Sequence, residues 1–286
     1  MSSHGIARPS FVQGPLPILA ACLLWGSTGT VSAFAPTTAP RVAIGAAALA
    51  VGGVLLFLTS PGTREVLRDA DRRLLAVGAV TVAGYASAFY PAVARTGVAV
   101  STTIALATAP ILLGARARPV VTAVAVVGCA TLVLGAGGAR LDLLGVVLAL
   151  VAGLSYAVYP VATGKLIAQG FPARAVVGTM FGGAALVVWP IPVVLGLSWL
   201  TTPGGLAVVA HLAIVTTFTA YLLFALGLRH TSAAAATTLT LAEPAVAALL
   251  GVVVLDEHLP PISWLGMAVL TAALFALTRE SSTRTP

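Results

Sequence analysis

The sequence predicts an all-α membrane protein of ten transmembrane helices, arranged as an inverted 5+5 repeat. Three observations lead to this fold class: an apolar composition, ten apolar stretches of spanning length, and a similarity between the two halves of the chain. Hydrophobic residues make up 59% of the 286 residues and charged residues 8%, with a mean hydropathy of +1.05. Soluble proteins carry about 25% charged residues. We therefore expect lipid around this chain, because a bilayer solvates an apolar exterior.

The ten apolar stretches are each long enough, or nearly long enough, to cross ~30 Å of hydrocarbon. They cover residues 16–34, 42–58, 74–93, 98–113, 120–134, 143–162, 175–195, 206–226, 232–255 and 262–277. The connections between them are short, so no water-soluble domain is expected.

The distribution of Lys and Arg predicts the topology. If the N-terminus lies in the cytoplasm, only Arg41, Arg95 and Arg140 of the 15 basic residues fall on or near the far side. Cytoplasmic connections carry an excess of basic residues, so this orientation is favoured, and an even number of spans returns the C-terminus to the cytoplasm. The same rule accounts for the net charge of +7, and we expect no nucleic-acid partner. The expected location is a bacterial-type inner, or plasma, membrane.

The two halves of the chain, residues 1–139 and 140–286, each predict five helices. Residues 95–110 read RTGVAVSTTIALATAP and residues 229–244 read RHTSAAAATTLTLAEP, and they match without gaps at an Arg, an Ala, a Thr and the final Pro. Five spans per half is an odd number, so the halves have opposite orientations. Inverted repeats are frequent in secondary transporters, with the substrate site near the midplane. Chance similarity between two helices rich in Ala and Thr is the alternative.

Three stretches resemble a known family. They read LLWGSTGTV at residues 23–31, AGLSYAVYP at 152–160, and AYLLFALGLRHTSAAAATTLTLAEPAVAALLGVVVLDEHL at 220–259. Together they resemble the EamA-type carriers of the drug/metabolite transporter superfamily, and the Glu-Pro pair is similar to that of threonine/homoserine exporters. The resemblance covers essentially the whole chain. It implies ten helices, an inverted repeat, a central cavity and transport without ATP hydrolysis.

The first repeat departs from the second after its proline. After Pro244 the chain reaches Asp256 and Pro260 before the last helix, whereas Arg116 and Arg118 follow Pro110 closely. The first repeat is thus about nine residues shorter, or roughly 13 Å of helix. We expect a fourth helix that barely spans. Either the fourth helix of an active member is pinched, or the chain is a degenerate paralogue.

Glu243 is the residue that we expect to carry chemistry. It is the only one of the eight acidic residues at membrane depth, where a carboxylate costs at least ~2.5 kcal/mol and normally faces the bundle interior. Its helical neighbours are small, namely Ala236, Thr240, Ala247 and Gly251, and small residues are typical of helix contacts. Pro244 leaves a carbonyl unpaired one turn earlier, so we expect helix breaks at Pro244 and at its counterpart Pro110.

Two functional roles fit Glu243. As a proton carrier it is protonated at rest, because desolvation disfavours the charged form; as a substrate ligand its carboxylate binds an ammonium group. Both roles combine if proton and amine compete for one site. A protonated glutamic acid that only bonds a neighbouring helix is the alternative. We expect Thr240, Thr237 and Thr103 to belong to the same coupling or substrate site, with Thr103 and Thr237 hydrogen-bonding across helices.

Four aromatic residues within the spans are candidates for lining a cavity. They are Trp25, Tyr85, Tyr156 and Tyr221. Ordinary packing or anchoring at the membrane interface explains them equally well. His211, near the outer end of the eighth span, is either a proton-transfer group or a neutral structural histidine.

The leading functional hypothesis is a secondary transporter that exports amino acids or other small amphiphilic metabolites, by proton antiport or facilitated diffusion. No phosphate-binding loop, metal-ligand cluster or nucleophile–base set is visible, so we expect no enzyme, no cofactor and no metal. A small-molecule substrate and the lipid bilayer are the expected partners, and a homodimer is left open. The shortened fourth helix sustains the alternative of a non-transporting membrane partner or scaffold.

Overall fold

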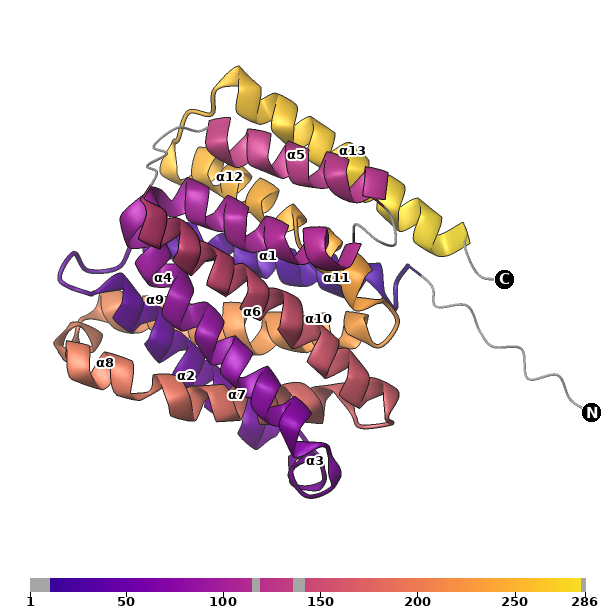
Figure 1. Ribbon diagram of the computed structural model, residues 1–286. Coiled ribbons are helices and arrows are strands. Elements are labelled where there is room, and N and C mark those ends of the chain that lie inside the picture. Colours follow the sequence, from indigo (N-terminus) through magenta and orange to yellow (C-terminus); the bar gives the residue numbers. More distant parts are fainter. Residues whose placement is uncertain (1–10, 115–118, 136–141, 284–286) are drawn as a thin grey trace, which may run out of the picture.

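The computed structural model describes residues 11–114, 119–135 and 142–283, and all regular structure in these ranges is helical (Figure 1). The predicted all-α class is therefore confirmed. Eight helices are long and apolar enough to cross a membrane: Pro15–Ser32, Arg41–Thr59, Arg72–Gly97, Leu143–Ala168, Ala173–Leu195, Pro203–Leu228, Ala233–Leu255 and Pro261–Thr278. Two shorter apolar helices, Val100–Gly114 and Pro119–Gly135, stand where the fourth and fifth spans were expected.

Several spans consist of more than one helical element. In chain order the elements are α1 (Pro15–Ser32), α2 (Arg41–Thr59), α3 (Thr63–Asp69), α4 (Arg72–Ala109), η1 (Pro110–Gly114), α5 (Pro119–Gly135), α6 (Leu143–Ala168), α7 (Ala173–Val188), α8 (Pro190–Leu195), η2 (Ser198–Thr201), α9 (Pro203–His211), η3 (Leu212–Thr219), α10 (Ala220–Leu228), α11 (Ala233–Leu239), α12 (Ala242–Leu255) and α13 (Pro261–Thr283). The elements η1 and η3 are π-helices, and η2 is a 3-10 helix.

Gly97 divides α4 into two apolar helices. Its φ of 84° lies in the left-handed region, which glycine adopts at little cost. Beyond it, Val100–Gly114 is one of the short helices, against 23 residues in Ala233–Leu255, and π-helical geometry begins at Pro110. Within the described residues the fourth apolar helix is thus the shorter of the two, whereas Arg116 and Arg118 lie outside them, so its reduced length across the membrane stays a prediction.

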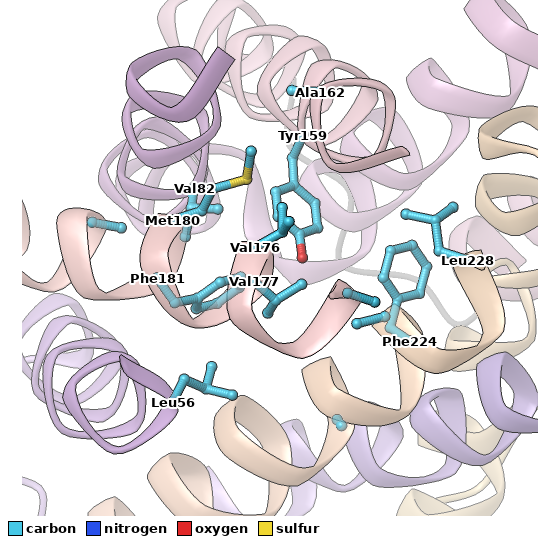
Figure 2. Close-up of a cluster of buried hydrophobic side chains, with 14 of the residues drawn as sticks. Leu56, Val82, Tyr159, Ala162, Val176, Val177, Met180, Phe181, Phe224 and Leu228 are labelled. Carbon is cyan, nitrogen blue, oxygen red and sulfur yellow. The ribbon is translucent and has the colours of Figure 1, made fainter. Parts of the chain in front are cut away.

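The largest buried cluster lies between α2, α6, α7 and α10. Figure 2 shows Tyr159, Phe181 and Phe224 among aliphatic side chains such as those of Leu56 and Val177. The rings of Tyr159 and Phe181 meet edge to face with centroids 5.7 Å apart, an arrangement that adds to the packing energy of aromatic side chains.

Close backbone crossings fix the helix pairs α5–α13 and α2–α7. A side-chain carbon on Gly128 of α5 would lie 2.6 Å from the Leu270 nitrogen of α13, and Figure 1 shows these two helices side by side. Similarly, a side-chain carbon on Gly53 of α2 would lie 2.5 Å from the Phe181 carbonyl oxygen of α7. Glycines at such crossings let helix backbones approach in a membrane, where van der Waals packing drives helix association.

Candidate functional site

The candidate site begins at a break in the ninth apolar segment. The helix α11 ends at Leu239 and α12 begins at Ala242. The Glu243 N–H donates to the Thr240 carbonyl at 3.0 Å, whereas Pro244 has no N–H to donate. The helix is therefore divided about one turn before Pro244. This division places Glu243 in the first turn of α12.

Glu243 is central to a group of side chains from five elements. It is close enough to interact electrostatically with Cys22 of α1, Tyr85 of α4 and Cys129 of α5. The same holds for Tyr156 of α6 and Tyr221 of α10. Glu243 itself is partly exposed. Among the described residues, the ion pairs join other acids to Arg side chains, so Glu243 is left without a basic partner there.

Tyr156 connects α6 to the break. Its hydroxyl donates to Thr240 Oγ1 at 2.7 Å, and Thr240 Oγ1 donates to the Thr237 carbonyl at 2.8 Å. The broken helix thus has a defined hydrogen-bond connection to the first helix of the second half.

The expected cross-helix bonds of Thr103 and Thr237 are wrong. The Thr237 hydroxyl donates to the Ala233 and Ala234 carbonyls of its own helix, and the buried Thr103 hydroxyl has no partner among the described residues. A threonine in a helix commonly bonds the carbonyl one turn earlier, so its side chain is not free for a neighbour.

Three of the aromatic candidates, Tyr85, Tyr156 and Tyr221, interact electrostatically with Glu243, and Trp25 packs against the third. Trp25 meets Tyr221 edge to face with ring centroids 4.9 Å apart, and Tyr85 lies 5.9 Å from Tyr156. The Trp25 indole N–H donates to the Thr216 carbonyl at 2.8 Å. Trp25 and Tyr156 are buried, at 7% and 8% exposure, which excludes an exposed interface anchor for these two. Whether the four contact substrate stays a prediction.

The segments next to the two predicted breaks also come close together. The element η1, which begins at Pro110, packs against α11, which ends shortly before Pro244. At Gly114 a side-chain carbon would lie 3.0 Å from the Thr238 hydroxyl. The corresponding segments of the two halves therefore meet beside the site.

Two further site contacts were missed from the sequence. Cys22 Sγ lies 3.7 Å from the Leu239 carbonyl at the break, and His211 Nε2 lies 2.9 Å from Ser27 Oγ. The two partners in each contact are far apart in the chain, and no local pattern marks either pair.

The chemistry of this group suits an organic cation. A carboxylate forms charge-assisted hydrogen bonds with an ammonium group, and Trp and Tyr rings attract cations through their faces. In the described part of the chain, no three His, Cys, Asp or Glu side chains gather as a metal site requires.

Comparisons with known proteins agree with a transporter. Residues 143–279 match the EamA-like transporter family. The chain is 38% identical over 273 residues to the "Uncharacterized transporter YwfM" of Bacillus subtilis (strain 168), covering 91% of this chain and 92% of that protein. It is 34% identical over 149 residues to the "Threonine/homoserine exporter RhtA" of Escherichia coli (strain K12), covering 51% and 48%.

A solved structure, described only as "Crystal structure of protein", superposes with a TM-score of 0.77 at 18% sequence identity, covering 93% of this chain and 97% of that one. At this identity the likeness shows a shared fold. The similarity to YwfM extends over nearly the whole length of both proteins, and the second half matches the family directly. The chain therefore belongs to the EamA-like transporter family of the drug/metabolite transporter superfamily.

Proposed function

We propose that the protein is a secondary transporter that exports amino acids or other small amphiphilic amines across the inner membrane in exchange for protons. The observation that carries this proposal is Glu243. It lies at a helix break in the middle of a span, beside Trp and Tyr rings and, among the described residues, without a basic partner. The name of RhtA, an exporter of threonine and homoserine, supports amino acids as the substrate class.

Proton and substrate movements are coupled because a proton and the substrate ammonium compete for the Glu243 carboxyl group. A carboxylate in a membrane interior is costly unless it is protonated or paired. When a substrate ammonium binds Glu243 from the cytoplasm, the carboxyl proton leaves, and the amine replaces it as the compensating charge. On the outer side, a proton displaces the amine. The Tyr156 and Thr240 hydroxyl oxygens add acceptors for a substrate N–H or O–H, because both hydroxyl protons are already donated within the protein.

The proposed architecture is ten spans in two inverted halves, residues 1–139 and 140–286, with both termini cytoplasmic. The helix contacts support it, because each contact has a counterpart when every helix is replaced by the equivalent helix of the other half. The helices α5 and α13 are equivalent and contact each other, and so are α2 and α7. Likewise α1 packs against α10 and α12, and α6 packs against α4 on both sides of Gly97. A side-chain carbon on Gly84 would meet Ser155 of α6, and one on Gly153 of α6 would meet Thr108. The two short helices then complete the count by tilting or by thinning the bilayer locally.

A non-transporting scaffold is the second candidate, favoured only by the short helix Val100–Gly114. Flux in proteoliposomes separates the two. The full-length protein is reconstituted, and uptake of labelled L-threonine, L-homoserine, the other common amino acids and simple primary amines is measured with and without a pH gradient. We expect uptake of at least one amine that depends on the gradient. Absence of flux for every compound, from protein that remains folded, would favour the scaffold.

A further inference from the structure

We propose that His211 is a second proton-binding residue of the transport cycle, which takes up the proton on the outer side before it reaches Glu243. This inference rests on the proposed proton exchange and on the proposed topology. It assigns a role to a residue outside the group that surrounds Glu243.

His211 lies inside the membrane-spanning part of the chain. It ends α9 and precedes the π-helix η3, within the span Pro203–Leu228, about 12 Å along the helix from its outer end. Its side chain is partly exposed. The other described histidines, His230 and His258, lie in connections between helices. Ionisable residues at this depth are costly and usually functional, and π-helical turns are frequent at functional sites.

The hydrogen bonds of Ser27 determine which nitrogen of His211 accepts the proton. Ser27 Oγ lies 2.6 Å from the Leu24 carbonyl and 2.9 Å from His211 Nε2. A carbonyl only accepts, so the single hydroxyl proton of Ser27 goes to Leu24, and Nε2–H of His211 donates to Ser27. In neutral His211 the lone pair is therefore on Nδ1. A proton can bind Nδ1 without loss of the Ser27 bond, so both charge states keep the same ring position.

Helix α1 connects His211 to Glu243. Ser27 bonds His211, and Cys22, deeper by about 7 Å along α1, interacts electrostatically with Glu243. Between them, α1 packs so closely on α12 that a side-chain carbon on Gly26 would run into Val246, one turn after Glu243. The two titratable groups thus contact the same helix at neighbouring depths.

The elements packed against α9 and η3 offer His211 no other acid. They are α1, α2, η2 and α10, and their titratable or charged residues are Cys22, Arg41 and Tyr221, with none on η2. The helix α12, which packs on the other side of α1, carries the carboxyl group of Glu243. In the proposed cycle an N–H bond forms at Nδ1 with a proton from outer water. That bond breaks as an O–H bond forms on Glu243, and the substrate ammonium leaves outward.

The test combines nuclear magnetic resonance with flux. Full-length protein labelled with ¹⁵N-histidine is placed in lipid nanodiscs, and His211→Gln identifies the His211 signals. We expect the neutral ring to carry its proton on Nε2, and the Nδ1 signal to change as the pH is lowered and that nitrogen binds a proton. A neutral ring protonated on Nδ1, or a shift that does not change with pH, overturns the proposal.

The functional arm uses the same His211→Gln protein in proteoliposomes. Gln retains an N–H donor for Ser27 but binds no proton, so uptake driven by the pH gradient should slow by about 100-fold, the lower end of the range for lost acid–base groups. Exchange of labelled for unlabelled substrate without a gradient should continue. Equal loss of both activities indicates a structural role and refutes the inference. If wild-type transport moves no protons, the proposed antiport itself fails, whatever the His211 signals show.

Discussion

Glu243 combines a carboxylate with a helix start at the middle of the membrane. The surrounding apolar bundle opposes a negative charge on Glu243, so the binding of a proton or of an ammonium group decides the charge state of its carboxyl group. A group that exchanges a proton for an amine requires this property.

Glu243→Gln should fold and insert normally but transport without dependence on pH. Gln keeps the shape and hydrogen-bonding capacity of glutamic acid and cannot titrate. Flux of the identified substrate, measured between about pH 5.5 and 8, checks the prediction. An unchanged pH profile in the variant would show that Glu243 does not couple proton and substrate.

Asp69→Asn is the matched control. The Asp69 carboxylate is exposed on α3, and the Arg68 guanidinium bonds it at 2.8 Å and lowers its pKa. A lowered pKa contributes stability above the pKa of the unfolded chain, and this is lost only as the pH falls through the folded value. That window lies below the range of the flux assay. The control should therefore keep the wild-type pH profile.

Tyr156 and Tyr159 give opposite predictions for the loss of one hydroxyl. Tyr156→Phe removes the bond to Thr240 and should destabilise by about 1 kcal/mol. The Tyr159 hydroxyl is buried without a partner among the described residues, among the side chains of Figure 2. Tyr159→Phe should therefore leave stability unchanged or raise it. Thermal unfolding in detergent measures both variants, and a larger loss for Tyr159→Phe would contradict the hydrogen-bond assignment.

The sequence revealed Glu243 because an acid stands out in an apolar helix, and it gave the four aromatic candidates by the same contrast. The sequence could not show which threonine makes a contact between helices, because that depends on the tertiary structure. Thr240 accepts a hydrogen bond from Tyr156 of another helix, whereas Thr237 donates to a carbonyl of its own helix. The His211–Ser27 and Cys22–Leu239 contacts required the tertiary structure, which brings distant segments together.

At the scale of elements, most of the helix discontinuities lie at or next to a proline or a glycine. Gly97 marks the turn inside α4, and Pro244 follows the break between α11 and α12. The π-helix η3 was not predictable in this way, since Leu212–Thr219 contains neither residue. Its Thr216 carbonyl accepts the Trp25 indole N–H, so tertiary packing accompanies this local geometry.

The α5–α13 crossing predicts a sharp difference between two glycines. Gly128→Ala places a carbon against the Leu270 backbone, and overpacking of this kind costs about 1–3 kcal/mol. Gly164 of α6 has nothing within 4 Å of the same position, so Gly164→Ala should be neutral or gain about 0.5–1 kcal/mol in helix propensity. Thermal unfolding again separates them, and equal effects would mean that α5 and α13 do not cross at Gly128.

At the scale of the whole molecule, two sequence signals point to one architecture. The exclusion of basic residues from one side predicts the orientation, and the match between residues 95–110 and 229–244 predicts the repeat. The helix contacts that recur when the halves are exchanged also support the repeat. This packing observation is independent of the sequence identity between the two segments. Span number was the weaker inference, because hydropathy alone leaves Val100–Gly114 and Pro119–Gly135 below full spanning length.

The decisive prediction for the architecture concerns these two short helices. If both cross the membrane, an alkaline phosphatase fused after Gly114 is inactive in the cytoplasm, and the same reporter fused after Gly135 is active outside. Fusions after Thr37 and after Thr278 calibrate the assay, with activity expected only for the first. Val100–Gly114, at 1.5 Å per residue, is only ~20 Å long, so it can cross the membrane only where the bilayer is locally thinner. Phosphatase activity after both Gly114 and Gly135 would mean eight spans, with the short pair folded into the outer half. That result would remove the equivalence of the two halves.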